Sequence, residues 1–224
     1  MTTRISLPRA VIFDWDNTLV DSWPTIAKAL NVTRSAFGLE TLSVDQARKN
    51  ASRSARDAFP AVFGAEWKRA HDMFYKKYHE IHLDYVTPMP GADELLLWLS
   101  EQKIPLFVVT NKRGDIVRLE AAKLGWTERF SALIGSTDAP RDKPARDPVD
   151  LALSRAGLKA DNPEIWFVGD TQADVECARN SGCTPVLVNH DLADAARLGV
   201  ALSFSGCFEL RSLLYNGANE NKSP

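Results

Sequence analysis

An apolar run that ends in two aspartates, residues 10–16, constrains this 224-residue chain more than any other segment. The run from Ala10 to Phe13 is typical of a buried strand. Side chains two positions apart on a strand point to the same side, so we expect Asp14 and Asp16 to lie close together at its carboxyl end. Ligands bind at this edge of open α/β sheets. Two neighbouring carboxylates repel each other unless a cation or a proton intervenes, so the pair predicts a metal or acid–base site. A turn whose carboxylates cap backbone amides is the alternative.

Beyond residue 90, strands and helices are expected to alternate. Helical periodicity predicts helices over residues 91–102, 114–124, 148–156, 172–181, 193–198 and 208–214. Short apolar runs between them predict strands over residues 104–109, 131–135, 164–168, 185–189 and 201–204. Alternation of this kind implies βαβ crossovers. We therefore expect the α/β class, with a Rossmann-like parallel sheet flanked by helices.

Residues 22–87 interrupt this alternation. Aromatic and aliphatic side chains recur there at helical spacing, as in Trp23, Ile26 and Leu30, and strand-like alternation is nearly absent. We therefore expect residues 1–21 and 88–216 to form the α/β core, and residues 22–87 to form an inserted helical-bundle cap. The polar segment 217–224 is predicted to be a disordered tail.

Composition narrows the classes of partner. With 27 basic and 29 acidic residues, the formal net charge of −2 gives no electrostatic reason to expect a nucleic-acid or membrane-surface partner. No apolar stretch approaches the roughly 20 residues that span a bilayer. The three cysteines, Cys177, Cys183 and Cys207, lack metal-ligand spacing, and we expect buried thiols in a reducing compartment. A cytoplasmic protein without nucleic-acid or membrane partners is the resulting expectation.

Three further signals follow expected strands. Thr110 and Asn111 offer a hydroxyl and an amide that can donate hydrogen bonds to an oxyanion. Lys143 precedes a proline, so its backbone is extended and the side chain can project across a pocket. Asp170 follows a strand and a glycine, and Asp174 is expected in the first turn of the next helix, facing Asp170. The helix dipole alone accounts for one of these two acids but not for both.

Together these side chains indicate phosphoryl chemistry. Four carboxylates, one lysine and a hydroxyl–amide pair are expected at the same edge of the sheet. Hard oxygen ligands of this kind suit Mg²⁺, which takes a few carboxylates together with substrate phosphate. An aspartate can serve as the nucleophile of phosphoryl transfer, and a lysine and a metal can neutralise the transferring group.

The four motifs, taken in order, resemble those of the haloacid dehalogenase superfamily. The first lies at residues 14–18, the second at 110–111, the third at 143–144 and the fourth at 169–174. The helical insert after the first motif resembles the subclass whose cap is a helical bundle. The resemblance implies an Mg²⁺-dependent phosphatase that hydrolyses a small phosphomonoester, such as phosphoglycolate, through an aspartyl-phosphate.

The resemblance also implies a role for each matching residue. Asp14 would be the nucleophile, and Asp16 would protonate the leaving alcohol and then activate water. Thr110 and the Asn111 backbone would hold the phosphoryl oxygens. Lys143 would pair with the nucleophile and the phosphate. Mg²⁺ would be held by the side chains of Asp14 and Asp170, by the Asp16 carbonyl, and by Asp174 directly or through water.

Substrate choice is expected to depend on the cap, where Arg53 and Arg56 are candidates to bind a carboxylate on the substrate. Three places depart from the family pattern. Trp15 lies at a position that tolerates variation, Arg146 stands where a proline is common, and the cap loop at residues 50–53 lacks a glycine that is common among relatives, which weakens the substrate assignment but not the chemistry. Arg146 could loosen the lysine loop or add positive charge near the site. The core motifs leave a sugar phosphomutase open as an alternative, and a non-catalytic binding protein on the same fold is a second. The oligomeric state is not predicted.

Overall fold

The chain forms two compact units joined by two crossings of the backbone. The computed structural model describes residues 6–50, 55–190 and 192–220. The larger unit comprises Met1–Val20 and Pro88–Pro224, and the helical unit comprises Asp21–Thr87. At the crossings, β2 (Val20–Asp21) and β3 (Thr87–Pro88) form a two-stranded sheet.

Six parallel strands form the sheet of the larger unit, and β1 lies near its middle. Ile12 of β1 pairs with Phe107 of β4 on one side and with Phe167 of β6 on the other. The predicted α/β fold with a parallel sheet is confirmed. In spatial order the strands are β5 (Ala132–Ser136), β4 (Leu106–Arg113), β1 (Ala10–Phe13), β6 (Ile165–Gly169), β7 (Thr184–Val188) and β8 (Leu202–Phe204).

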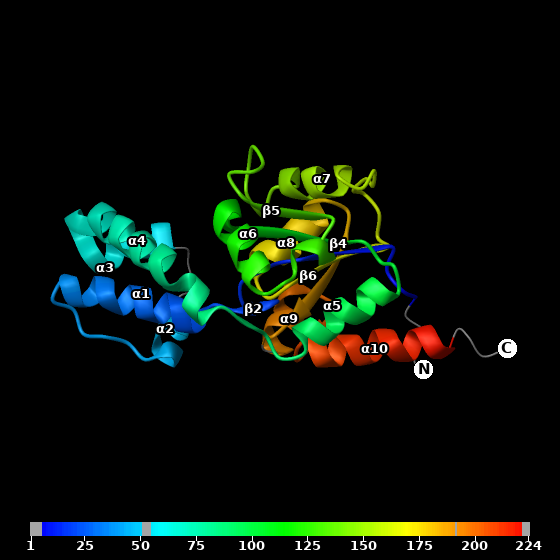
Figure 1. Cartoon of the computed structure of the whole chain (residues 1–224), viewed down its shortest axis with the longest axis horizontal. Coiled ribbons are helices and arrows are strands. Elements are labelled where there is room, and N and C mark those ends of the chain that lie inside the picture. Colours follow the sequence, from blue (N-terminus) through cyan, green and yellow to red (C-terminus); the bar gives the residue numbers. More distant parts are fainter. Residues whose placement is uncertain (1–5, 51–54, 191, 221–224) are drawn as a thin grey trace. The chain divides into compact units, whose positions relative to one another are not determined.

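Helices cover both faces of this sheet, as right-handed crossovers require when the strand order reverses beside β1. Figure 1 shows α7 on one side and α5 with α10 on the other. The helices are α5 (Ala92–Glu101), α6 (Gly114–Lys123), α7 (Asp147–Ser154), α8 (Gln172–Asn180), α9 (Leu192–Leu198) and α10 (Cys207–Glu220), with a 3₁₀ turn η2 (Thr127–Arg129).

The main core fills the space between the sheet and two helices. Ile12 and Phe167 pack there with Val149 of α7 and Ala178 of α8, and all four side chains are buried. Every residue of β1 is buried, because helices shield both faces of a central strand. This burial explains why the strand is an apolar run without alternation, and polar residues begin only at its carboxyl end, where Asp14 follows.

The helical unit is built around α4, which packs against α1 and α3. Its buried aromatic side chains include Phe59, Phe63, Phe74 and Tyr78. The ring of Phe59 contacts those of Phe63 and Phe74, and the ring of Phe74 contacts that of Tyr78. In chain order its elements are α1 (Trp23–Ala36), α2 (Val44–Asn50), α3 (Ala55–Phe63), a 3₁₀ turn η1 (Gly64–Glu66) and α4 (Trp67–Tyr85).

Two elements extend well beyond their predicted ends. Strand β4 was expected to end at residue 109 but continues to Arg113, with an irregularity in its pairing with β5 after Val109. Helix α10 extends to Glu220, so disorder from residue 217 is wrong for residues 217–220. Leu210, Leu214 and Ala218 are buried at four-residue spacing, which anchors this last part of the helix.

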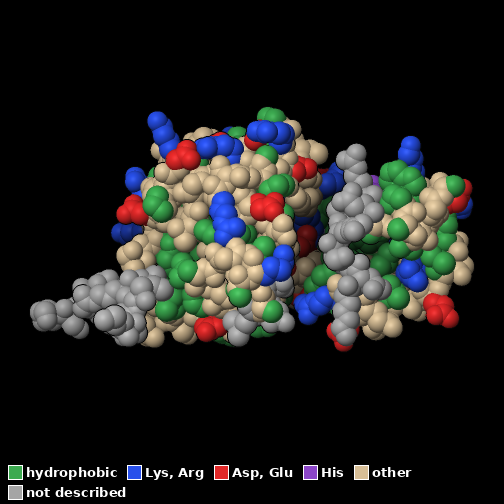
Figure 2. All heavy atoms as spheres, turned by 180° about the vertical axis from the view of Figure 1, so that it is seen from behind, with side chains coloured by type: hydrophobic (Ala, Val, Ile, Leu, Met, Phe, Trp, Pro, Cys, Tyr) green, Lys and Arg blue, Asp and Glu red, His purple; other side chains and the backbone are tan. Residues whose placement is uncertain are grey.

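The distribution of surface charge and the burial of the thiols agree with what the composition led us to expect. On the face drawn in Figure 2, Lys and Arg side chains of the larger unit are interspersed with Asp and Glu. Cys177, Cys183 and Cys207 are free and buried, and burial raises the pKa of each thiol to about 12. Among the described residues, no helix has both the length and the apolar character that crossing a membrane demands.

Two leucines of α5 allow a matched test of the core. Leu99 is fully buried, whereas Leu97 is 50% exposed. We expect Leu99→Ala to lower the free energy of unfolding by about 2–5 kcal/mol, because it removes apolar contacts and leaves a cavity. Leu97→Ala, with the same change in helix propensity, should lower it by less than about 1 kcal/mol. Denaturant titration measures both, and equal losses would contradict this account of the core.

Candidate active site

A buried lysine lies between two aspartates at the carboxyl edge of the sheet. Lys143 Nζ lies 2.6 Å from Asp14 Oδ1 and 2.6 Å from Asp174 Oδ1. The side chain of Lys143 is 3% exposed, and both aspartates are buried. Burial opposes the charged lysine, but the charges of Asp14 and Asp174 outweigh it, so the pKa of Lys143 is raised. The lysine is therefore a fixed positive charge that links β1, the loop after β5 and α8.

Three carboxylates gather around this lysine. Oxygens of Asp14, Asp170 and Asp174 all lie within 4.8 Å of one another. Burial raises the pKa of Asp14 to about 6; Lys143 lowers it and the charge of Asp174 raises it. Burial, with the charges of Asp14 and Asp174, also raises the pKa of Asp170. One ammonium group leaves this cluster negative, and three hard oxygens at such spacing fit a divalent cation.

The start of α8 holds Asp174 in place. Asp174 Oδ2 accepts hydrogen bonds from the Thr171 backbone N–H at 2.9 Å and from the Thr171 hydroxyl at 2.6 Å. One oxygen of Asp174 therefore caps the helix, while the other accepts from Lys143. Gly169 makes room for this arrangement, because a Cβ added there would lie 2.4 Å from Asp174 Cβ.

The loop after β1 is tied to the neighbouring strand ends. The buried Thr18 hydroxyl donates to Asp170 Oδ1 at 3.1 Å. Asn189, just beyond β7, donates from Nδ2 to the Asn17 carbonyl at 2.8 Å. Asn17 has a φ of 61°, a left-handed conformation that asparagine tolerates better than most residues. These contacts fix how the chain turns after Asp14.

Asn111 positions the lysine through its side chain. Its Nδ2 donates to the Lys143 carbonyl at 3.0 Å, and its Oδ1 accepts from the Lys143 N–H at 2.9 Å. This two-point clamp fixes the backbone of Lys143 from the end of β4. Thr110 is buried beside it, and its hydroxyl accepts from the Lys112 N–H at 3.2 Å.

Asp16 lies apart from the three gathered carboxylates. Its Oδ1 lies 2.7 Å from Lys112 Nζ, and its side chain is 29% exposed. Among the described residues, the group of carboxylates within 4.8 Å contains Asp14, Asp170 and Asp174 but not Asp16. Strand alternation ends at Phe13, and the Leu19 and Val20 N–H groups donate to the Trp15 carbonyl, so the chain curls between the two aspartates.

The structure describes the contacts of only one of the three arginines singled out in the sequence. Arg146 pairs with Asp150 at 2.8 Å and with Asp161 at 2.9 Å, so surface carboxylates take up its charge. Arg53 lies outside the described residues, and Arg56 lies in α3, where its side chain is not described. Neither the substrate role of Arg53 nor that of Arg56 is tested by the structure.

Sequence reasoning missed Lys112 and Glu120 as parts of this region. Lys112 lies 2.7 Å from Glu120 Oε2 as well as from Asp16. Lys112 directly follows the Thr110–Asn111 motif, which was the available signal. Glu120 offered none, because its position on α6 resembles that of any helical glutamate. Thr18, which directly follows Asn17 in the first motif, was likewise given no role.

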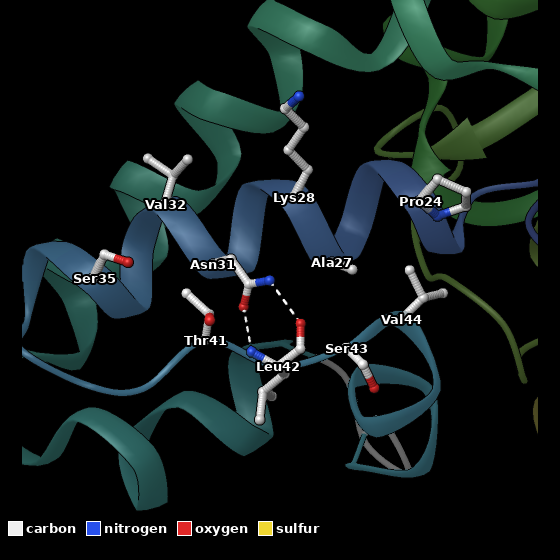
Figure 3. A pocket seen from close by; sticks show the side chains of 10 residues that line it. All are labelled: Pro24, Ala27, Lys28, Asn31, Val32, Ser35, Thr41, Leu42, Ser43 and Val44. Carbon is white, nitrogen blue, oxygen red and sulfur yellow. Dashed lines mark hydrogen bonds between the residues drawn. The ribbon is translucent and has the colours of Figure 1, made fainter.

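The helical unit has a separate hollow of about 740 Å³ between α1 and residues 41–44. Asn31 bridges its two sides, because its amide accepts from the Leu42 N–H and donates to the Leu42 carbonyl (Figure 3). Lys28, on the same helix, points away from the loop toward α4, where it donates to the Tyr85 hydroxyl. None of the predicted site residues whose side chains the structure describes lines this hollow.

The raised pKa of Asp14 predicts how stability depends on pH. Between about pH 4 and pH 6 the folded protein holds this proton more tightly than the unfolded chain. The ionised carboxylate therefore destabilises the metal-free protein at pH 7.5, by up to about 3 kcal/mol, and this cost declines from about pH 6 and is lost at about pH 4.

We therefore expect Asp14→Asn to be more stable than the wild type at pH 7.5 in chelator-treated buffer, with the difference closing at pH 4. Urea unfolding at both pH values measures it. A difference that is the same at both values, or a less stable variant at pH 7.5, would contradict the electrostatic account.

Comparison with known proteins identifies the family of the chain. The sequence matches the family described as haloacid dehalogenase-like hydrolase over residues 11–188. A protein of Chromobacterium violaceum named phosphoglycolate phosphatase is 33% identical over 218 residues, which cover 93% of this chain and 97% of that protein. A Pseudomonas aeruginosa protein named N-acetylmuramic acid 6-phosphate phosphatase is 30% identical, over 81% of this chain and 82% of that protein.

Solved structures share the fold. A predicted phosphoglycolate phosphatase from Haemophilus somnus superimposes with a TM-score of 0.81 at 24% identity, covering 93% of this chain and 99% of that one. A hydrolase of the same superfamily from Ehrlichia chaffeensis gives a TM-score of 0.67 at 27% identity, over 96% and 100% of the two chains. The matched range, residues 11–188, spans the aspartates and the lysine described above. The chain is therefore an enzyme of the haloacid dehalogenase-like hydrolase family, as its sequence predicted.

Proposed function

We propose that this hydrolase is an Mg²⁺-dependent phosphatase that hydrolyses a small phosphomonoester through an aspartyl-phosphate at Asp14. The observation that carries the proposal is the contact between the buried Asp14 carboxylate and Lys143, beside Asp170 and Asp174. A carboxylate held next to a fixed cation can approach a phosphate dianion that would otherwise repel it. The relatives named as phosphatases support the same chemistry.

In the first step Asp14 attacks phosphorus, and the bond between phosphorus and the leaving oxygen breaks. Asp16 gives its proton to that oxygen, so that the product leaves as an alcohol. Asp16 then takes a proton from the water that attacks the phosphorus of the aspartyl-phosphate, and Asp14 is released with inorganic phosphate. Lys143 stays charged throughout and offsets the negative charge of the transferring group.

The cation would be held by the side chains of Asp14 and Asp170, the Asp16 carbonyl, and Asp174 directly or through water. When bound, Mg²⁺ supplies charge neutralisation at the phosphoryl oxygens. Thr110 and the Asn111 backbone would donate hydrogen bonds to these oxygens. The Asn111 side chain has the separate task of clamping Lys143.

The substrate is proposed to carry a carboxylate as well as a phosphate. The names of the two relatives contain phosphoglycolate and N-acetylmuramic acid 6-phosphate. Each compound carries a phosphate ester on a hydroxyl group and a free carboxylate. Arg53 and Arg56 are proposed to bind that carboxylate. The free cysteines suit a reducing compartment, so we expect the enzyme to act in the cytoplasm.

Phosphate release from a panel of phosphomonoesters, with and without Mg²⁺, tests the reaction. We expect turnover that chelation abolishes and that Asp14→Asn lowers to below about one thousandth, because the nucleophile is lost. Asp150→Asn, the same change at a surface ion pair, is the matched control and should keep wild-type turnover.

Turnover that survives in Asp14→Asn would contradict the proposed nucleophile. Interconversion of sugar phosphates without net phosphate release would indicate a phosphomutase. A binding protein without catalytic activity would bind Mg²⁺ but release no phosphate from any ester in the panel.

Removal of Arg53 and Arg56 tests the substrate class. We expect the double Arg→Ala variant to raise KM for phosphoglycolate about 10- to 100-fold, because charge-assisted hydrogen bonds to the carboxylate are lost. KM for p-nitrophenyl phosphate, which has no carboxylate, should change little. Lys68→Ala, in the same helical unit, is the control for a general loss of positive charge. An equal change for both substrates would reject the role of these arginines.

A further inference from the structure

A row of buried polar side chains lies behind Asp16. Lys112 Nζ lies 2.7 Å from Asp16 Oδ1 and 2.7 Å from Glu120 Oε2. The Trp15 indole N–H donates to the same glutamate oxygen at 2.7 Å. The side chains of Lys112 and Glu120 are 5% and 2% exposed, whereas Asp16 is 29% exposed. Asp16 is thus the solvent-facing end of a chain of contacts that runs into the core.

The inner end of this chain is rigidly packed. Trp15 is fully buried, and the Trp126 ring meets it edge-on with centroids 5.9 Å apart. Phe130 packs against Trp15 in a similar geometry at 6.4 Å. Trp126 is itself fixed by a hydrogen bond of 2.8 Å from its indole N–H to Asp93. The anchor therefore rests on residues from α5, α6 and the segment around η2.

Stability alone does not account for a lysine at this position. Removing an ammonium and a carboxylate from water costs several kcal/mol per ion, and well-packed apolar residues often replace such pairs without loss of stability. The lysine provides a defined geometry instead, since an ammonium held between two carboxylates restricts the rotamer of each. At Asp16, that restriction acts on the residue assigned to proton transfer.

We propose that Lys112 is a positioning residue, anchored by Glu120 and Trp15, that holds the Asp16 carboxyl in its working orientation. This inference rests on the proposed function, in which Asp16 exchanges protons with the leaving alcohol and with water. Proton transfer requires the carboxyl within about 2.6–3.2 Å of the reacting oxygen, and a displacement of about 1 Å can cost a hundredfold in rate. Loss of Lys112 should therefore lower kcat without weakening substrate binding.

The test compares Lys112→Met in two backgrounds, wild type and Asp16→Asn. An aryl phosphate with a good leaving group is the substrate, so that the residual rate of Asp16→Asn is measurable. We expect kcat to fall about 10- to 100-fold in the wild-type background, with KM changed less than about twofold. In the Asp16→Asn background the same substitution should have no further effect, because the lysine acts through Asp16.

Further variants keep the test valid if the unpaired glutamate harms folding. Lys112→Met with Glu120→Gln removes both buried charges and leaves an acceptor for Trp15, so it should fold and still lose kcat. Lys123→Met, at the exposed end of α6, is the matched control. If neither Lys112 variant folds, Trp15→Phe, which removes the donor to Glu120, is compared in the same two backgrounds and should lower kcat only when Asp16 is present.

An equal loss of kcat with and without Asp16 would overturn the proposal, as would wild-type kcat in a folded Lys112 variant. These results differ from a failure of the proposed function. In that case the wild type would show no Mg²⁺-dependent turnover, or Asp14→Asn would retain it, whatever the effect of Lys112.

Discussion

The salt bridge of Lys143 with Asp14 and Asp174 is the contact on which the rest of the site depends. It joins a strand end, a loop and a helix start that are far apart in the sequence. Without the lysine, three carboxylates would be buried together with no positive charge, which typically destabilises a fold by several kcal/mol. The same crowding that destabilises the metal-free protein would be relieved by the cation that the proposed function requires.

The surrounding structure serves this salt bridge. Asn111 holds the lysine backbone at two points, and Thr171 holds the second oxygen of Asp174. A glycine is needed at position 169, because a Cβ there would clash with the Asp174 side chain. Parallel strands with helices on both faces bring these segments to one edge, where the chain leaves the buried sheet and polar side chains meet solvent.

Much of this arrangement was predictable from local patterns. The apolar runs, the glycines after helices and the four polar motifs identified the parallel sheet and the residues at its edge. The extension of β4 to Arg113 was not predictable, because residues 110–113 are polar and their strand geometry depends on pairing with β5. The continuation of α10 through Gly217 likewise depends on burial of Ala218, which no local pattern reports.

The contacts of Asp16 illustrate the same limit. The spacing of Asp14 and Asp16 suggested a shared location, but the turn after Phe13 directs Asp16 to Lys112, which in turn contacts Glu120. Asp16 and Lys112 are 96 positions apart, so their contact depends on the packed fold and cannot be predicted from local sequence patterns. Trp15, which appeared to be a tolerant position, is fully buried and bonded to Glu120 for the same reason.

The central claim is that Asp14 carries the phosphoryl group during turnover. Mass spectrometry of the enzyme, quenched in acid within milliseconds of mixing with a phosphomonoester and Mg²⁺, tests this most directly. The account predicts one added phosphoryl group on the peptide that contains Asp14, with kinetics that match phosphate release. A phosphoryl group on any other residue, or phosphate release without a phosphorylated peptide at any quench time, would contradict it.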